Sequence, residues 1–290
     1  MEYSIEDWVA NGPADRAEFR KAVHIVLHAI SSSPYLKPKM VMKGGLLLGI
    51  RYQSSRYTED IDFSTAEKLT AIDKNEFETE LNESLQVASS ELQYGVECRV
   101  QSCKIQPRAE ATFPSFNLKI GYANTSNSNA MKRLESGNSP NTVKIDYSFN
   151  EMTYQTDEIE LEGEVINAYG VTDLIAEKLR SIIQQPYRKR NRRQDIYDVH
   201  FLLTSLSPLS SEEKLNVLST LYKKCKDRVP VEDVNQETLD RDDIKDMSRS
   251  DYNLLAHEVA GELPDFEVAY SKVQEFYREL PWDCLVLGGE

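Results

Sequence analysis

The sequence predicts an α+β protein in which a sheet-bearing domain (residues 1–165) precedes a helical domain (residues 166–290). Two patterns lead to this fold class. Segments such as "SFNLKIGY" and "TVKIDYSF" alternate apolar and polar residues with the period of a strand. From Thr172 onward, apolar residues instead recur every three to four positions, as in amphipathic helices. A chain of 290 residues is long enough for two such domains.

The first domain is expected to alternate helices and strands. The segment "DRAEFRKAVHIVLHAIS" has apolar residues at helical spacing, and "KMVM" is a short apolar strand candidate. The pair Gly44–Gly45 then breaks the pattern, and "LLLGIRYQ" resumes as a short helix. "RYTEDIDFS" reads as a strand, "DKNEFETELNESLQVASSEL" as a helix, and "GVECRVQSCKI" as a strand.

Three further segments are assigned by composition. "ANTSNSNAMKRLESGNSPN" has the composition of a protruding loop, and "DEIELEGEVI" that of one short acidic strand or connector. The acidic run "ETLDRDDIKD" reads as a solvated face or linker.

Four helices are expected in the second domain: "TDLIAEKLRSIIQQ", "RRQDIYDVHFLLTS", "SSEEKLNVLSTLYKK" and "FEVAYSKVQEFYREL", with Ser210 and Glu213 as a capping box.

Composition narrows the classes of function. The net charge of −14 argues against a surface that coats nucleic acid, so a nucleic-acid partner would need a local basic patch. No apolar stretch is long enough to span a bilayer, and the acidic first residues do not read as a secretory signal. The four cysteines lack metal-ligand spacing and are expected to be free thiols, so we expect a cytoplasmic protein without a membrane partner.

Carboxylates and glycines form the chemically informative pattern. Asp60 and Asp62 lie on one face of their predicted strand, because strand side chains alternate. Asp146 projects from the polar face of a later strand and would join them if the two strands pair. A divalent cation such as Mg²⁺ (or Mn²⁺) would relieve the repulsion between these carboxylates and bind substrate phosphates. Gly44 and Gly45, before a helix, would let backbone N–H groups approach an anion.

Each of these signals has a simpler explanation when taken alone. A lone D-x-D on a strand is more often a solvated face, and a lone Gly-Gly is usually only a turn. The joint order of strand, Gly-Gly, helix, D-x-D strand and later acidic strand is more specific. The pair His24 and His28 has no evident third ligand, and Tyr197 could stack on a base but is more simply a packing residue.

The spacing of fourteen residues between "GG" and "DID" resembles the motif of the nucleotidyltransferase superfamily of the DNA polymerase β type. More narrowly, "KGG" followed by "RYTEDIDF" is similar to the AbiEii/AbiGii (MenT-like) toxin family. The later block "EKLRSIIQQPYRKRNRRQDIYDVHFLL" (177–203) is similar to that family's helical-half motif. Leu46 and Gln194 depart from the family pattern, which usually has Thr and Arg there.

The resemblance implies a nucleotidyltransferase domain with a central mixed sheet, followed by a helical domain. It implies that Asp60 and Asp62 are catalytic and bind the metal, and Asp146 is the third metal-ligand candidate if its strand pairs beside theirs. Lys178 and Asp198 match the family's catalytic lysine and aspartate. The resemblance also implies contacts to the nucleoside triphosphate, which is the co-substrate, from Lys43, Gly44, Gly45, Arg56, Thr58 and Lys178.

The second block also contains a cluster of basic residues within the acidic chain. "YRKRNRR" carries Arg188, Lys189, Arg190, Arg192 and Arg193. The cluster is either a solvated loop between helices or a site for the phosphate backbone of RNA. Asp195 and Asp198, three residues apart, share a helix face, and they either serve the chemistry or pair with the preceding arginines.

The sequence therefore predicts a metal-dependent nucleotidyltransferase that moves a nucleotide to an acceptor hydroxyl. The family resemblance and the basic cluster predict RNA as the acceptor, and the resemblance narrows it to tRNA. The resemblance also implies that the protein is the toxin of a toxin–antitoxin or phage-defence system with a cognate antitoxin as partner. A small aminoglycoside-like or protein acceptor, and a non-catalytic nucleotide-binding module of the same fold, are the alternatives.

Overall fold

The computed structural model describes residues 5–161 and 163–284. Part of the amino-terminal segment expected not to be a secretory signal lies outside them. The chain divides into two compact units, which we call the sheet unit (Met1–Gln53 and Thr58–Tyr169) and the helical unit (Ser54–Tyr57 and Gly170–Glu290). The predicted boundary at residues 165–166 falls within the last strand of the sheet unit. The segment Ser54–Tyr57 groups with the helical unit although it lies between two elements of the sheet unit.

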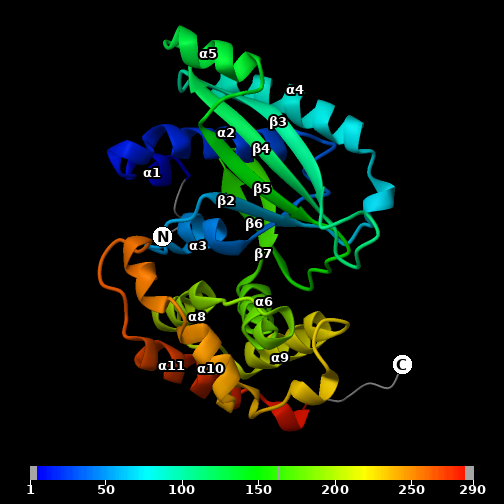
Figure 1. Cartoon of the computed structure of the whole chain (residues 1–290), viewed down its shortest axis with the longest axis vertical. Helices are drawn as coiled ribbons and strands as arrows, with labels where there is room; N and C mark the ends of the chain where they lie inside the picture. The colour runs from blue at the N-terminus through cyan, green and yellow to red at the C-terminus, as the bar shows by residue number, and fades with distance from the viewer. Residues whose placement is uncertain (1–4, 162, 285–290) are drawn as a thin grey trace. The chain divides into compact units, whose positions relative to one another are not determined.

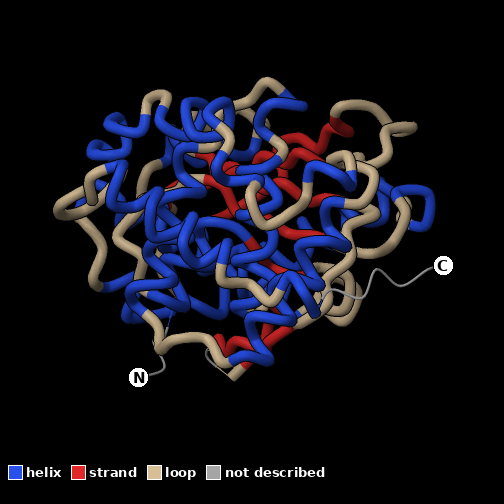
Figure 2. Tube along the Cα trace, turned by 90° about the horizontal axis from the view of Figure 1, so that it is seen from below, coloured by secondary structure: helices blue, strands red, loops and turns tan. Residues whose placement is uncertain are grey.

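The sheet unit is built on a mixed sheet, which confirms the predicted α+β class. Within the described residues, seven strands run side by side in the order β3-β4-β5-β2-β1-β7-β6, drawn red in Figure 2. The pairs β2–β5 and β1–β7 are parallel and the other neighbours antiparallel. The strands are β1 (Val41–Lys43), β2 (Asp60–Ser64), β3 (Val96–Gln106), β4 (Ser115–Asn124), β5 (Thr142–Ser148), β6 (Thr156–Leu161) and β7 (Glu164–Tyr169).

Two long helices, α2 (Ala17–Ser32) and α4 (Lys74–Leu92), cover one face of this sheet (Figure 1). Phe77 of α4 packs on Phe116 and Tyr147 of the strands, with ring centroids 5.4 and 5.6 Å apart, and all three rings are buried. Burying each such side chain contributes about 1.5–3 kcal/mol, so this face carries the core. The helices of the unit are α1 (Ile5–Ala10), α2 (Ala17–Ser32), α3 (Gly44–Tyr52), α4 (Lys74–Leu92) and α5 (Ser128–Glu135).

The opposite face of the central strands is polar. In β2, Ile61 and Phe63 are buried in the core, whereas Asp60 and Asp62 alternate with them. The strand β5 repeats the pattern, with Val143, Ile145 and Tyr147 buried and Lys144 and Asp146 on the other face. The alternation predicted for both strands is confirmed.

Up to residue 284, the helical unit contains the four predicted helices and two more. The helices are α6 (Val171–Ile183), α7 (Gln185–Arg188), α8 (Arg193–Ser205), α9 (Ser211–Cys225), α10 (Asp242–Arg249) and α11 (Phe266–Arg278). Helix α6 packs against both α8 and α9, and α11 packs against α8. The capping box is confirmed, because Ser210 Oγ accepts from the Glu213 amide and the Glu213 carboxylate accepts from the Ser210 amide.

Local predictions fail where a helix or turn is short. The segment predicted as a loop contains α5, because the Asn127 side chain accepts from the Ala130 amide and begins a helix. The predicted single acidic strand is two strands, β6 and β7, which pair as a hairpin. The acidic run predicted as a linker contains α10, which buries Ile244. The predicted strand around Arg56 begins only at Asp60.

All four cysteines are free, as expected, and three of them are buried. None of the helices that the structure describes combines the length and the apolar character needed to cross a bilayer.

The buried His24 of α2 makes the stability of the sheet unit depend on pH. Its Nδ1 lies 2.9 Å from the Tyr94 hydroxyl, and burial together with His28 lowers the pKa of His24 to about 4 from 6.5. Because the folded pKa is the lower one, stability is fully present above pH 6.5 and is lost as the pH falls toward 4.

Between pH 6.5 and pH 4, the wild-type protein loses unfolding free energy as His24 is protonated. We expect this loss to be smaller by about 1–3 kcal/mol in His24→Gln. Denaturant unfolding of both proteins over a pH series measures this difference. A wild-type pH dependence that persists in the variant would contradict the assignment to His24.

Candidate active site

One row of side chains crosses the polar face of the sheet. In cross-strand register, Lys43 of β1 lies opposite Asp62 of β2, and Asp62 lies opposite Asp146 of β5. Asn117 of β4 follows opposite Asp146. Directly opposed residues share a face, so the two carboxylates are immediate neighbours. Like charges in this position are destabilising, which indicates that the row is not selected for stability alone.

Asp146 is the most constrained carboxylate in the row. Its Oδ1 is buried and accepts no hydrogen bond from any residue that the structure describes. Burial raises the pKa of Asp146, a hydrogen bond from Ser115 and the charge of Lys43 lower it, and Glu151 and Asp60 raise it further. The net direction is upward, because burial and the neighbouring carboxylates outweigh Ser115 and Lys43.

Gly44 allows Asp62 to approach the first turn of α3. Gly44 has φ +80°, and a Cβ built at this position would lie 2.0 Å from Asp62 Oδ2. Only glycine therefore fits between the helix and this carboxylate. Helix α3 begins at Gly44 and includes Gly45, so the glycines form its first turn rather than a break before it, and no side chain caps that turn.

Asp60 lies apart from the other two aspartates. It is opposite Lys144 in the register, and its Oδ1 lies 3.7 Å from Lys144 Nζ with both side chains more than half exposed. Among the described residues, no group of three His, Cys, Asp or Glu side chains is arranged to hold a metal ion. The structure thus brings Asp62 and Asp146 together and leaves Asp60 with Lys144. The metal-binding role of all three stays a prediction.

Sequence reasoning missed Glu151, which binds the lysine of the row. Lys43 Nζ lies 2.9 Å from Glu151 Oε2, and both side chains are buried. Glu151 follows Asn150, which has φ +58°, and its amide donates to the Thr65 carbonyl. Lys43 was predicted to contact the nucleotide, and the structure places its charge on this carboxylate. An acidic residue just after a strand with an acidic polar face is the signal that could have identified Glu151.

A second cluster, in the helical unit, contains the predicted Lys178, Asp198 and Arg56. Arg56 holds Asp198 with two hydrogen bonds, both 2.8 Å long, from Nε and from its terminal nitrogen. Lys178 Nζ lies 2.6 Å from Asp198 Oδ2 and 3.1 Å from Asp195 Oδ1. Two positive and two negative charges thus form a buried network, which we call the ion network.

Electrostatics keep the ion network charged. Burial alone would raise the pKa of Asp198, but Arg56 and Lys178 outweigh burial, so its pKa lies below the usual value. Burial would lower the pKa of Lys178, but Asp198 and Asp195 outweigh burial and raise it. The pair Lys178–Asp198 is therefore lost only in acid below the ordinary carboxyl pKa or in base above the ordinary lysine pKa.

The ion network anchors the segment Ser54–Tyr57. Arg56 also forms a β-bridge with Val259, and the Tyr57 amide donates to the Glu258 carbonyl over 2.6 Å. Thr58, the next predicted nucleotide contact, already belongs to the sheet unit. Arg56 is therefore buried against Asp198.

Comparison with known proteins fixes the family. The sequence profile described as "Nucleotidyl transferase AbiEii toxin, Type IV TA system" matches residues 26–277. The chain belongs to the AbiEii family of nucleotidyltransferase toxins. The predicted family and the predicted enzyme class are both confirmed.

Two solved structures from Helicobacter pylori share the fold of this AbiEii protein. One is JHP933, with 17% identity, a TM-score of 0.51 and coverage of 92% of this chain and 91% of that one. The other is described as a nucleotidyltransferase, with 15% identity, a TM-score of 0.50 and coverage of 96% of this chain and 100% of that one. No curated protein matches the sequence.

The basic run of the AbiEii protein begins at the end of α7 and ends at the first residue of α8. Arg188, Lys189 and Arg190 are exposed, and Arg192 and Arg193 are half-buried. Arg193 is paired with Glu258 at 3.0 Å. Tyr197, considered for base stacking, is 5% exposed and bonded to Ser55, so it is a packing residue.

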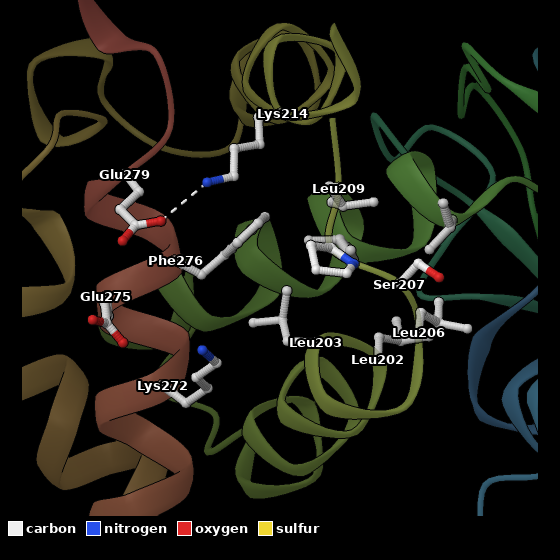
Figure 3. A pocket seen from close by; sticks show the side chains of 13 residues that line it. Leu202, Leu203, Leu206, Ser207, Leu209, Lys214, Lys272, Glu275, Phe276 and Glu279 are labelled. Atoms are coloured by element: carbon white, nitrogen blue, oxygen red, sulfur yellow. Dashed lines mark hydrogen bonds and ion pairs between the residues drawn. The ribbon is translucent and has the colours of Figure 1, made fainter. Parts of the chain in front are cut away.

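The helical unit also contains a pocket of about 210 Å³ (Figure 3). Leu202, Leu203 and Phe276 form apolar walls, and Lys214 bridges to Glu279 at one side. None of the predicted site residues is among those that line it. The pocket is therefore separate from the ion network and the basic run.

Gly44 offers a test of the close approach to Asp62. We expect Gly44→Ala to displace the Asp62 carboxylate, abolish nucleotidyl transfer and cost about 1–3 kcal/mol of unfolding free energy. Gly137→Ala is the matched control, because Gly137 has φ +71° but no atom lies within 4 Å of the added Cβ. Transfer assays and denaturant unfolding of both variants compare strain with and without the clash. Equal activity in the two variants would contradict the proposed contact.

The ion network predicts a large effect from one neutralised charge. Asp198→Asn leaves Arg56 and Lys178 with too little negative charge, and we expect a loss of about 3–5 kcal/mol. The comparison is made at neutral pH, where Asp198 and Lys178 of the wild-type protein are both charged. Glu279→Gln, which breaks the exposed pair with Lys214, is the control and should cost less than about 1 kcal/mol. Equal losses, measured by denaturant unfolding, would show that the buried network has no special weight.

Proposed function

We propose that this AbiEii protein uses a divalent cation to transfer a nucleotidyl group from a nucleoside triphosphate to a hydroxyl of RNA. The observation that carries the proposal is the pair Asp62 and Asp146, side by side on the polar sheet face and next to the first turn of α3. The acceptor oxygen bonds to the α-phosphorus, and the bond from the α-phosphorus to the bridging oxygen breaks. Pyrophosphate leaves with the electron pair, and the hydroxyl proton passes to solvent.

The carboxylates of the row suit Mg²⁺ or Mn²⁺. Both cations take carboxylate oxygens, and the buried Asp146 Oδ1 is an acceptor without a hydrogen bond from any described residue. Mg²⁺ commonly binds through one or two carboxylates together with substrate phosphates, so a preformed group of three protein ligands is not required. Asp62 and Asp146 would hold the cation, and Asp60, which faces Lys144, lies two residues before Asp62 on the same strand. When bound, the cation would neutralise charge that develops on the phosphates.

The chain itself supplies orientation. The uncapped first turn of α3 presents backbone N–H groups, which favour the anionic triphosphate beside the carboxylates. We assign Lys178 and Asp198 to positioning, because both oxygens of Asp198 are occupied and its low pKa disfavours proton uptake at neutral pH. Through Arg56 they hold the segment that ends three residues before Asp60.

The basic run supports RNA as the acceptor. In a chain with net charge −14, it concentrates five positive side chains where a phosphate backbone could bind. The family description also supports a cognate antitoxin as partner. The acidic remainder of the surface is the one feature that favours a small cationic acceptor instead.

The test offers each α-labelled nucleoside triphosphate with Mg²⁺ and either total RNA or an aminoglycoside. We expect labelled RNA, and we expect Asp62→Asn and Asp146→Asn to lower transfer by at least about 100-fold, because the lost charge held the cation. Neither variant should be less stable, since each removes a like-charge contact.

Glu160→Gln, at an exposed position on β6, is the matched control and should transfer normally. Label on the aminoglycoside alone would overturn the RNA acceptor. Normal turnover by either Asn variant, or full activity in a chelator, would overturn the metal site.

A further inference from the structure

Two adjacent buried glutamines organise the surface around the basic run. Gln184 accepts from the Arg180 side chain at 2.6 Å, donates to the Arg228 carbonyl at 3.3 Å, and its own carbonyl accepts from the Arg188 amide at 3.1 Å. Gln184 thus contacts the Arg180 side chain and the backbones of Arg188 and Arg228, which belong to α6, α7 and the segment after α9. Arg180 and Arg228 lie outside the basic run and give no signal of their own in the sequence.

Gln185 fixes the backbone of the run itself. It is 1% exposed, its Oε1 accepts from the Arg192 amide at 2.6 Å, and its carbonyl accepts from the Arg190 amide at 3.3 Å. Its Nε2 is held by Ser248 at 2.7 Å. A solvated loop between helices needs no such anchoring, whereas a surface that binds phosphates gains from a fixed backbone.

The gathered cations repel one another. Burial lowers the pKa of Arg188, and the charges of Arg180, Arg228, Arg192 and Arg190 lower it further. Arg180 is paired with Glu177, whereas Arg188, Lys189 and Arg190 are exposed to solvent. A polyanion would relieve this repulsion.

An exposed aromatic ring stands beside these arginines on α7. Tyr187 is 38% exposed, although its hydroxyl donates to Asp233 and accepts from Arg241 at 3.3 Å. The hydroxyl is therefore anchored while part of the ring stays open to solvent. Fixed aromatic rings next to cations are the groups on which unpaired bases stack.

We propose that Tyr187, Arg188 and Arg228 form a binding surface for a single-stranded stretch of the RNA acceptor. The proposal rests on the proposed function and names the form of RNA that it would use. A base stacks on the Tyr187 ring, and the arginines contact the flanking phosphates. A continuous duplex keeps its base faces stacked inside and would lose the contact with Tyr187.

The test measures binding of a labelled single-stranded RNA of about 12 nucleotides, and of its duplex, across a salt series. We expect Tyr187→Ala to weaken single-strand binding by about 5- to 100-fold, while Tyr187→Phe keeps the ring and binds nearly as wild type. Arg228→Gln should flatten the slope of log affinity against log salt by about 0.7. Lys272→Gln, which removes the same charge beside the pocket of Figure 3, should change neither quantity.

The outcomes separate the two proposals. Equal loss in the Ala and Phe variants, or a duplex that binds as tightly as the single strand, would overturn the stacking surface. The stacking surface would also be overturned if RNA affinity fell when Lys189, Arg190 and Arg192 were replaced with glutamine but did not change in Tyr187→Ala or Arg228→Gln. A wild-type protein that transfers nucleotide to another acceptor and has no RNA affinity would overturn the RNA acceptor of the proposed function itself.

Discussion

The parallel pairing of β2 with β5 is the constraint on which the site depends. It places Asp62 directly opposite Asp146 on the polar sheet face, while Phe63 and Tyr147 lie opposite each other in the core. The apolar face fixes the register, because a shift by one residue would turn the core side chains outward. Burial of aromatic side chains on the other face of the same strands therefore offsets the repulsion between the two neighbouring carboxylates.

The two lysines beside this pair each contact another carboxylate. Lys43 lies opposite Asp62 and forms an ion pair with Glu151, and Lys144 is paired with Asp60. Gly44 has no side chain to separate Asp62 from the first turn of α3. A cation bound together with the phosphates of a nucleotide is the partner that this charge pattern favours.

The ion network of the helical unit differs from the carboxylate pair, because its positive and negative charges balance each other. Arg56, Lys178, Asp195 and Asp198 are buried as a neutral group, in which removing one member would leave an uncompensated charge. Such a network fixes geometry better than it moves protons. Its members come from α6, α8 and a segment that the chain passes through just before β2, so the network holds that segment to the helices.

The sequence predicts the fold class and the strand faces well, because period-two and period-3.6 patterns follow directly from burial. The alternation of Asp60, Ile61, Asp62 and Phe63 is the clearest case. The placement of Asp146 beside Asp62 needed the strand order, which alternation does not specify.

Side-chain partners could not be read from the sequence. Lys43 reads as a phosphate ligand, but its contact with Glu151 depends on the turn at Asn150. Arg56 and Asp198 are 142 residues apart, and only the tertiary structure joins them. The α5 and α10 helices were missed because both are short and strongly polar. Helix α5 depends on the Asn127 cap and the buried Leu134, whereas α10 has no side-chain cap and buries Ile244 and Ser248.

The most direct measurement of the central claim is the thermal stability of wild type and Asp146→Asn with and without Mg²⁺ and a non-hydrolysable nucleoside triphosphate. If Asp62 and Asp146 bind a cation, Asp146→Asn is at least as stable as wild type when no ligand is present. Mg²⁺ with nucleotide then raises the melting temperature of wild type only. A variant that is less stable without ligands and keeps the full Mg²⁺-dependent increase would contradict the claim.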